Sequence, residues 1–128
     1  MLNRLIYVAA MNENRPTHAA KEYERRITFE ITTPSPLPVG QQVFISGNIE
    51  MLGAWQPDGF PLTRMDDNLW TGYAVIPTGS PIEFKITRGL WHTEEADADG
   101  NVRVHNQTLA EHGNVAYRHK IIRWLDRA

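Results

Sequence analysis

The sequence predicts an all-β domain folded as an antiparallel two-sheet sandwich. Short segments with strand-like patterns recur at intervals of roughly ten residues, Gly- and Pro-containing turns connect them, and no segment has the apolar periodicity of a long helix. The chain has 128 residues and a mass of 14.6 kDa, which is the length of one domain. We therefore expect a single sandwich.

The first predicted strand begins at Arg25. Ile27, Phe29 and Ile31 alternate with polar residues, which is the period of two of a half-buried strand. Three prolines between residues 34 and 38 end it, because proline cannot donate to a sheet ladder.

Two further strands are predicted in the middle of the chain. Residues 42–46 form a short β-branched and aromatic run, and residues 69–76 form a longer one. On the longer strand Trp70, Ala74 and Ile76 share one face, which predicts that Trp70 belongs to the core.

The clearest amphipathic strand follows a Pro- and Gly-containing turn. Ile82, Phe84 and Ile86 alternate with Glu83 and Lys85. Lys85 is therefore predicted to point away from the apolar side of the sheet.

The rest of the chain predicts shorter strands, at about residues 91–95, 102–104, 107–109 and 115–125, with a turn at residues 98–101. The last segment fits neither the strand nor the helix period fully. Its β-branched and aromatic content favours a strand, and a bulge near Ile121 and Ile122 would reconcile its two faces. Trp124 is predicted to lie in the core.

Composition excludes several classes of function. The formal net charge of −2 is unlike the basic surface of a nucleic-acid-binding or anionic-membrane-binding protein. The absence of Cys excludes disulfides, thiolate nucleophiles and Cys-ligated metals. No apolar run reaches the roughly 20 residues of a membrane-spanning helix.

Residues 1–24 are predicted to form a polar leader outside the core, with one helical turn around residues 19–24. The apolar stretch at the start is shorter than a usual signal-peptide core and lacks a small-x-small cleavage site. We expect a cytoplasmic protein, with the sandwich spanning residues 25–128.

No motif indicates catalysis, a metal or a cofactor. The serines lack a Gly-x-Ser-x-Gly elbow, the glycines do not form a phosphate-binding loop, and no two histidines have metal-ligand spacing. The acidic stretch at residues 94–99 lacks the ligand ladder of a calcium loop, so we interpret it as a hairpin turn with a solvated rim. The histidines are interpreted as solvated as well.

Two tryptophans have unusual surroundings. Trp55 lies in a polar loop and Trp91 follows a strand, and both are flanked by Gly and polar residues. Because loops normally face solvent, these indoles could be exposed and could stack on the C–H face of a pyranose ring. The alternative is that they close the end of the sandwich, as tryptophans are usually largely buried.

Three segments carry a resemblance to the starch-binding domains of the family 20 carbohydrate-binding modules. Residues 43–55 (VFISGNIEMLGAW) resemble the V-x-x-x-G-x-x-x-x-L-G-x-W piece of this family, and residues 69–86 resemble its L-W, L-P-x-G and E-Y-K-F run. Asn106 lies where a late Asn-Arg usually stands. The similarity covers roughly residues 25–124 and extends, more distantly, to the glycogen-binding domain of AMP-activated kinase β subunits.

The resemblance implies an immunoglobulin-like sandwich of about seven or eight strands that binds α-1,4-glucan without catalysis, cofactor or metal. The family's main glucan site maps onto Trp55, Lys85, Trp91 and Asn106, with the two indoles stacking and the other two side chains forming hydrogen bonds. Lys85 could equally be a solubilising charge on the sheet face. A separate carbohydrate-active or esterase-type enzyme is an expected partner.

The sequence departs from the family pattern in two places. Trp91 follows Arg88 and Gly89 directly, as in bacterial starch-binding-like domains associated with esterase-type enzymes, and Gln107 replaces the usual Arg. The second, Tyr-containing site of the family has no clear counterpart. Tyr23 and Tyr73 are candidates for it by residue type alone.

Two rival functions stay open on the sequence. A protein-interaction module could keep the sandwich and lose the sugar site. An enzyme could use an unfamiliar site among acidic and imidazole side chains, although none of them pairs a nucleophile with a base. The residues of that candidate site are Glu94, Asp97, Asp99, His92 and His105.

Overall fold

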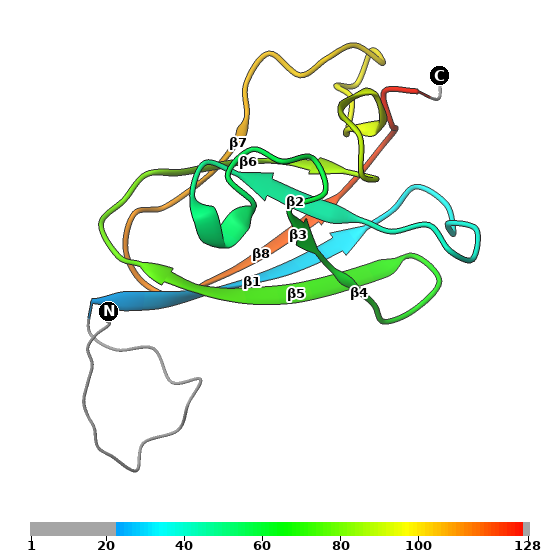
Figure 1. Cartoon of the computed structure of the whole chain (residues 1–128). Helices are drawn as coiled ribbons and strands as arrows, with labels where there is room; N and C mark the ends of the chain where they lie inside the picture. Colours follow the sequence, from blue (N-terminus) through cyan, green and yellow to red (C-terminus); the bar gives the residue numbers. More distant parts are fainter. Residues whose placement is uncertain (1–22, 127–128) are drawn as a thin grey trace.

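Eight strands in two layers make up the part of the chain that the structure describes. It is a computed structural model that describes residues 23–126 (Figure 1). The strands are β1 (Glu24–Thr32), β2 (Phe44–Gly47), β3 (Phe60–Pro61), β4 (Thr63–Arg64), β5 (Leu69–Pro77), β6 (Ile82–Thr87), β7 (Gln107–Leu109) and β8 (Val115–Lys120). Two 3-10 helices, η1 (Glu50–Leu52) and η2 (Trp91–Thr93), lie in the connections. The predicted all-β class and the predicted number of strands are confirmed.

One sheet has the strand order β4-β5-β1-β8. Along β1 every second side chain is buried, as the alternation of apolar and polar residues predicts. β1 pairs antiparallel with β5 along its whole length, from Glu24 opposite Pro77 to Thr32 opposite Leu69. This pairing fixes which faces of both strands point into the sandwich.

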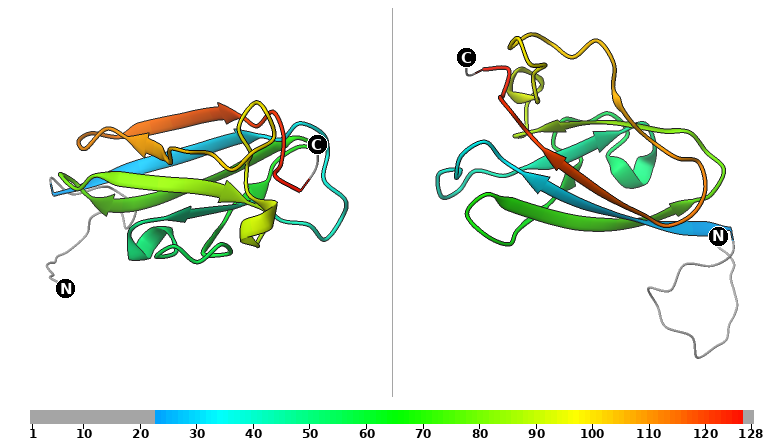
Figure 2. Two further views of the ribbon diagram at one scale, coloured as in Figure 1. Left: turned by 90° about the horizontal axis from the view of Figure 1, so that it is seen from above. Right: turned by 180° about the vertical axis from the view of Figure 1, so that it is seen from behind.

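β8 runs parallel to β1, with Ile27 opposite Val115 and Thr32 opposite Lys120. Figure 2 shows β8 alongside β1, on the side away from β5. The other strand pairs in the described residues are antiparallel, so this one pair departs from the antiparallel arrangement that we expected. An alternating pattern fixes the faces of a strand but not its direction, and parallel neighbours need a long crossover. Here the connection is long because the chain forms β6 and β7 of the other sheet between β5 and β8.

The second sheet has the order β3-β2-β6-β7. β6 is its central long strand: Ile82, Phe84 and Ile86 are buried, whereas Glu83 is exposed and Lys85 is partly exposed. Lys85 therefore points to the outer face of this sheet, as its sequence period predicts. The strands at both edges, β3 and β7, are only two and three residues long, which limits pairing with other chains.

The inner faces of the two sheets form one hydrophobic core. Phe29 of β1 and Phe84 of β6 meet edge to face, with ring centroids 5.4 Å apart, and Tyr117 of β8 packs on Phe84 at 5.0 Å. Each such pair stabilises the fold by about 0.5–1.5 kcal/mol beyond the area it buries. Trp70 and Trp124 are both buried, which confirms their prediction as core residues.

Three predicted local structures are wrong. Residues 91–95 form η2 and an isolated bridge from Glu95 to Trp124 instead of a strand. Residues 102–104 have only the bridge between Val102 and Ala96. The last strand ends at Lys120, without a bulge, because Ile121 turns into the core and its N–H donates to the carbonyl of Thr32.

The predicted leader lies almost wholly outside the described residues. At its end, Glu24 is the first residue of β1 rather than the end of a helical turn, so the strand starts one residue before the predicted Arg25. Within residues 23–126, no helix has the length and apolar character needed to span a membrane.

Candidate functional site

Trp55 is presented by a strained loop that follows η1. Gly53 closes η1 with φ +93°, and Ala54 and Trp55 continue in the left-handed region at φ 49° and 62°. Such a conformation costs about 1–3 kcal/mol for each non-glycine residue. Two backbone hydrogen bonds hold it: Ala54 N–H donates to Ile49 at 3.0 Å, and Trp55 N–H donates to Gly47 at 2.9 Å.

The base of this loop closes by glycine-to-glycine contact. A Cβ added to Gly53 would lie 2.6 Å from the Cα of Gly59, and one added to Gly59 would lie 2.3 Å from the Cα of Gly53. Leu52 is fully buried and anchors the loop to the core. The indole of Trp55 is left 36% exposed at the surface.

Trp91 is presented by a different connection, the one between β6 and β7. Thr93 organises its first turn: its hydroxyl donates to the carbonyl of Leu90 at 2.8 Å and accepts from the N–H groups of Arg88 and Leu90, both at 3.2 Å. Gly89, with φ +112°, reverses the chain ahead of it. Trp91 is 37% exposed.

All four predicted sugar-binding residues line one groove of about 440 Å³. Its lining consists of Trp55, Lys85, Trp91, Glu94, Val102 and Asn106. The loop after η1, strand β6 and the long β6–β7 connection thus all contribute side chains to this groove. In Figure 1 that connection, in yellow and orange, extends beyond the ends of the strands.

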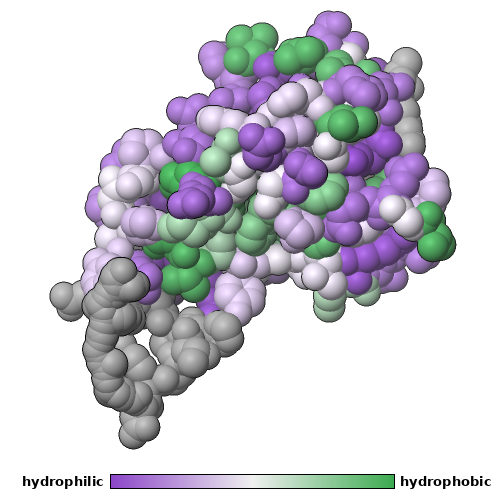
Figure 3. Space-filling model, in the orientation of Figure 1, coloured by the Kyte–Doolittle hydropathy of each residue, from purple (hydrophilic) through white to green (hydrophobic). Residues whose placement is uncertain are grey.

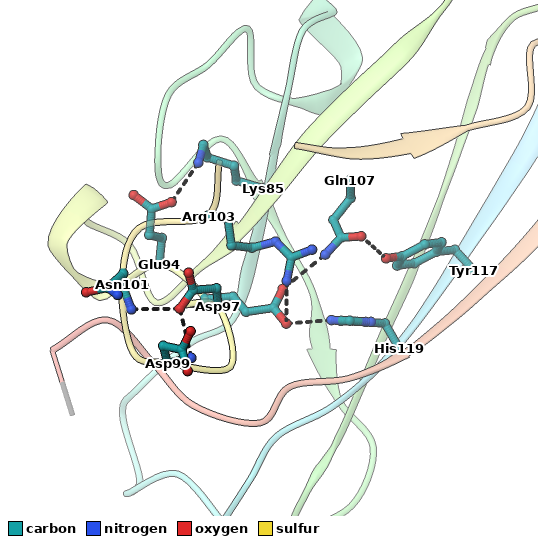
Figure 4. Close-up of polar contacts among 10 residues, drawn as sticks. Lys85, Glu94, Asp97, Asp99, Asn101, Arg103, Gln107, Tyr117 and His119 are labelled. Carbon is teal, nitrogen blue, oxygen red and sulfur yellow. Dashed lines mark hydrogen bonds and ion pairs between the residues drawn. The ribbon is translucent and has the colours of Figure 1, made fainter. Parts of the chain in front are cut away.

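The polar part of the groove is an ion pair. The Lys85 ammonium lies 2.8 Å from Oε1 of Glu94, and the two side chains are 20% and 8% exposed (Figure 4). The pair leaves the groove without net charge. Nearby, Asn106 donates from Nδ2 to Oε1 of Glu83 at 2.9 Å, which fixes its amide and leaves its carbonyl oxygen as an acceptor.

Glu94 and Val102 line the groove although sequence reasoning did not predict them there, and Glu94 is the polar one. The prediction of a solvated acidic rim is wrong for Glu94 and Glu95, which are both buried. The backbone explains why, since Glu95 N–H donates to Ile86 at 2.8 Å and Leu125 N–H donates to Glu94 at 2.8 Å. Contacts so distant in sequence leave no local pattern. The rest of the stretch behaves as predicted, because Asp97 accepts from the N–H groups of Asp99 and Asn101 in a tight turn.

Glu95 belongs to a second polar cluster, the Glu95 cluster, whose other members are Arg103, Gln107, Tyr117 and His119, all labelled in Figure 4. Its carboxylate lies 2.6 Å from Nε2 of His119 and 3.3 Å from Nε2 of Gln107, with Arg103 at 3.8 Å. His119 is therefore a partner of a buried acid rather than a solvated imidazole as predicted. Tyr117 donates to Gln107 at 2.7 Å.

Tyr117 has a displaced pKa. Burial, and secondly the negative charge of Glu95, raise its pKa to about 12, while the charge of Arg103 acts in the opposite direction. The phenol is therefore neutral near neutral pH and serves as a hydrogen-bond donor. This cluster ties β8 and β7 to the connection that carries one wall of the groove.

The residues of the rival catalytic site do not converge. Glu94 is paired with Lys85, Asp97 holds its turn, and His92 and His105 are exposed. Between residues 23 and 126, no three His, Cys, Asp or Glu side chains gather as metal ligands. Tyr23 and Tyr73 are both exposed, and neither lines the groove.

Comparison with known proteins identifies the family. The family model of the starch binding domain, CBM_20, matches residues 24–120. The chain is 29% identical over 102 residues to an alpha-amylase of Niallia circulans, covering 79% of this chain and 8% of the amylase. It is 28% identical over 105 residues to an amylopullulanase of Thermoanaerobacterium thermosulfurigenes, covering 79% of this chain and 6% of that enzyme.

One solved structure supports the fold over most of its own length. The family 20 carbohydrate-binding module of a maltotetraose-forming amylase from Pseudomonas saccharophila superposes with a TM-score of 0.52 at 20% identity, covering 75% of this chain and 99% of the module. The immunoglobulin-like sandwich and the family resemblance predicted from the sequence are confirmed. The chain belongs to the starch binding domain family, CBM_20, whose members are non-catalytic carbohydrate-binding modules.

Proposed function

We propose that this domain binds α-1,4-glucan, such as starch, glycogen or maltooligosaccharides, in the groove lined by Trp55 and Trp91. The observation that carries the proposal is the presence of two partly exposed indoles in one groove with an ammonium and an amide. A pyranose can stack on an indole through its C–H face while its hydroxyls bond to polar groups. Membership of the starch binding domain family supports the same ligand.

The affinity follows from the stacking. By analogy with bases stacked on aromatic rings, each indole contributes about 1–3 kcal/mol. Together with a few hydrogen bonds, this gives dissociation constants of roughly micromolar to millimolar. A domain with this affinity anchors a polymer reversibly. We accordingly propose that it serves a carbohydrate-active enzyme, acting on the same glucan, as the relatives it matches are an amylase and an amylopullulanase.

The first prediction tests the groove. Titration with β-cyclodextrin, followed by tryptophan fluorescence and calorimetry, is expected to saturate at millimolar ligand or below. Trp55→Ala should lower the affinity by roughly 5- to 150-fold, since it removes one stacking contact of about 1–3 kcal/mol. The thermal midpoint should change little, because Trp55 is 36% exposed.

Met65→Ala is the control, an exposed large apolar residue outside the groove, and should bind as the wild type does. Absence of binding by the wild-type domain at millimolar β-cyclodextrin and soluble starch would refute the proposal. Capture of a specific protein by such a sugar-inert domain would favour the interaction module instead.

A further inference from the structure

Glu94 lines the groove with the two indoles, yet the residues carried over from the family resemblance do not include it. Its side chain is only 8% exposed. A carboxylate that is this buried usually has partners for both oxygens, because removing a charge from water is costly. Within the described chain, Lys85 partners Oε1 alone.

The ion pair of Lys85 and Glu94 retains hydrogen-bonding capacity that residues 23–126 do not use. Oε2 of Glu94 receives no hydrogen bond from residues 23–126. Lys85 likewise bonds only to Glu94 in that range, so two of its three N–H donors remain. An acceptor and a donor of opposite charge are therefore held side by side at the groove surface, by a contact of 2.8 Å.

We propose that Glu94 contacts the sugar and, with Lys85, recognises a pair of adjacent hydroxyl groups on a neutral glucan. One hydroxyl oxygen accepts from the ammonium of Lys85, and the neighbouring hydroxyl donates to Oε2 of Glu94. The ligands are glucans in which both secondary hydroxyls of a glucose unit, at O2 and O3, are free. This inference rests on the proposed function and adds the requirement for a hydroxyl donor.

The charges in the groove support a neutral diol. Lys85 alone would attract anionic sugars, but Glu94 cancels its charge at 2.8 Å and repels them. Stacking on Trp55 and Trp91 does not distinguish a free hydroxyl from an ether. A carboxylate acceptor does, because an ether has no proton to donate and leaves Oε2 unpaired.

Calorimetric titration with three ligands tests the inference: β-cyclodextrin, the derivative methylated at every O2 and O3, and the derivative methylated at every O6. The wild type should bind the O2/O3-methylated ligand at least about tenfold more weakly than the O6-methylated one. Glu94→Gln should weaken β-cyclodextrin binding about tenfold, because a single amide oxygen replaces two carboxylate oxygens. It should leave the affinity for the O2/O3-methylated ligand unchanged.

Glu50→Gln is the matched control, as Glu50 is exposed and does not line the groove, and it should retain the wild-type discrimination. Equal weakening of all three ligands by Glu94→Gln would assign Glu94 a purely structural role and overturn the inference, as would no weakening. If a thermal melt shows that the Gln variant does not fold, Glu94→Asp replaces it. Asp keeps the charge but withdraws it by one methylene, so this variant should also reduce the difference in affinity between the O6-methylated and the O2/O3-methylated ligand. A wild type that binds none of the ligands refutes the proposed function itself.

Discussion

Single residues fix the shape of the groove through backbone conformations that other residues would avoid. Ala54 and Trp55 have φ values of 49° and 62°, which side-chain-bearing residues rarely adopt. Buried Leu52 and two backbone hydrogen bonds hold them in place. These contacts hold the strained loop in one conformation before the ligand binds, so that less entropy is lost on binding.

The second prediction tests this fixed conformation. Gly53→Ala places a Cβ 2.6 Å from Gly59 at a φ of +93°, so both the loop base and the backbone must shift. We expect a loss of about 2–4 kcal/mol of unfolding free energy. Weaker binding of β-cyclodextrin is also expected, since Trp55 is two residues away. Urea unfolding and calorimetric titration measure the two effects.

Gly40→Ala isolates the contribution of φ alone. Gly40 also has φ +93°, but an added Cβ meets nothing within 4 Å. This variant should lose about 1 kcal/mol and keep its affinity. If both variants were equally destabilised and both bound normally, the close approach of Gly53 and Gly59 would have no role in presenting Trp55.

At this scale the match to a family motif predicted Trp55, Lys85, Trp91 and Asn106 as glucan-binding residues, and the structure gathers these four in one groove. The direction of Lys85 followed independently from the two-residue period of its strand. The place of Glu94 in the groove was not predicted, because its burial depends on partners that include Leu125, 31 residues further along the chain. An acidic run has the same appearance in sequence whether it is solvated or paired.

At the scale of elements, β1 and β6 were predictable because each carries its own alternating pattern. The connection between β6 and β7 was not, since distant contacts hold it rather than a regular ladder. Glu95 attaches this connection to the sheets, because its carboxylate contacts His119 of β8 and Gln107 of β7. β3 and β4 were missed as well, as two residues are too few to show a period.

The third prediction concerns this attachment. Glu95→Gln removes the charge that faces His119 at 2.6 Å and Arg103 at 3.8 Å, in a position where Glu95 is buried. We expect a loss of about 1–3 kcal/mol of stability. Binding should weaken as well, because Val102 and Asn106 belong to the connection that Glu95 anchors.

Glu30→Gln is the control for burial. Glu30 also pairs with a cation, Arg118 at 2.9 Å, but these side chains are far more exposed. Such surface pairs contribute at most about 1 kcal/mol, so the thermal midpoint of this variant should barely move. A Glu95→Gln variant as stable as Glu30→Gln, with intact binding, would contradict the anchoring role of Glu95.

At the scale of the whole molecule, the sandwich follows from the pattern of its strands, but the parallel β1–β8 pair does not. The alternation along β8 specifies that Val115, Tyr117 and His119 face inward, and either direction of the strand would satisfy it. The direction is set by the connections and by the side chains that β8 brings to the interface between the sheets. Tyr117 is the most informative of these, since it contacts both sheets at once.

The fourth prediction uses Tyr117 as a probe of sheet-to-sheet packing. Its ring packs edge to face on Phe84 at 5.0 Å and on Phe29 at 6.4 Å, and its hydroxyl donates to Gln107. Folding raises the pKa of this phenol from 10.0 to about 12, so the neutral form is favoured in the folded state. The stability that this difference contributes is therefore fully present below pH 10 and is lost as the pH rises toward about 12. In an alkaline titration followed by phenolate absorbance, one of the four tyrosines should ionise last, together with partial unfolding.

Tyr117→Phe keeps the ring but removes the ionisable hydroxyl, so the last ionisation should disappear from the titration. At neutral pH the variant should lose about 1 kcal/mol, the contribution of one hydrogen bond. Its stability should then fall less steeply between pH 10 and 12 than that of the wild type, as measured by urea unfolding at a series of pH values. A variant with an unchanged late-ionising tyrosine would show that the displaced phenol lies elsewhere. In that case the phenol of Tyr117 would not be shielded from solvent by its packing on Phe84 and Phe29, and the role of Tyr117 in joining the two sheets would be contradicted.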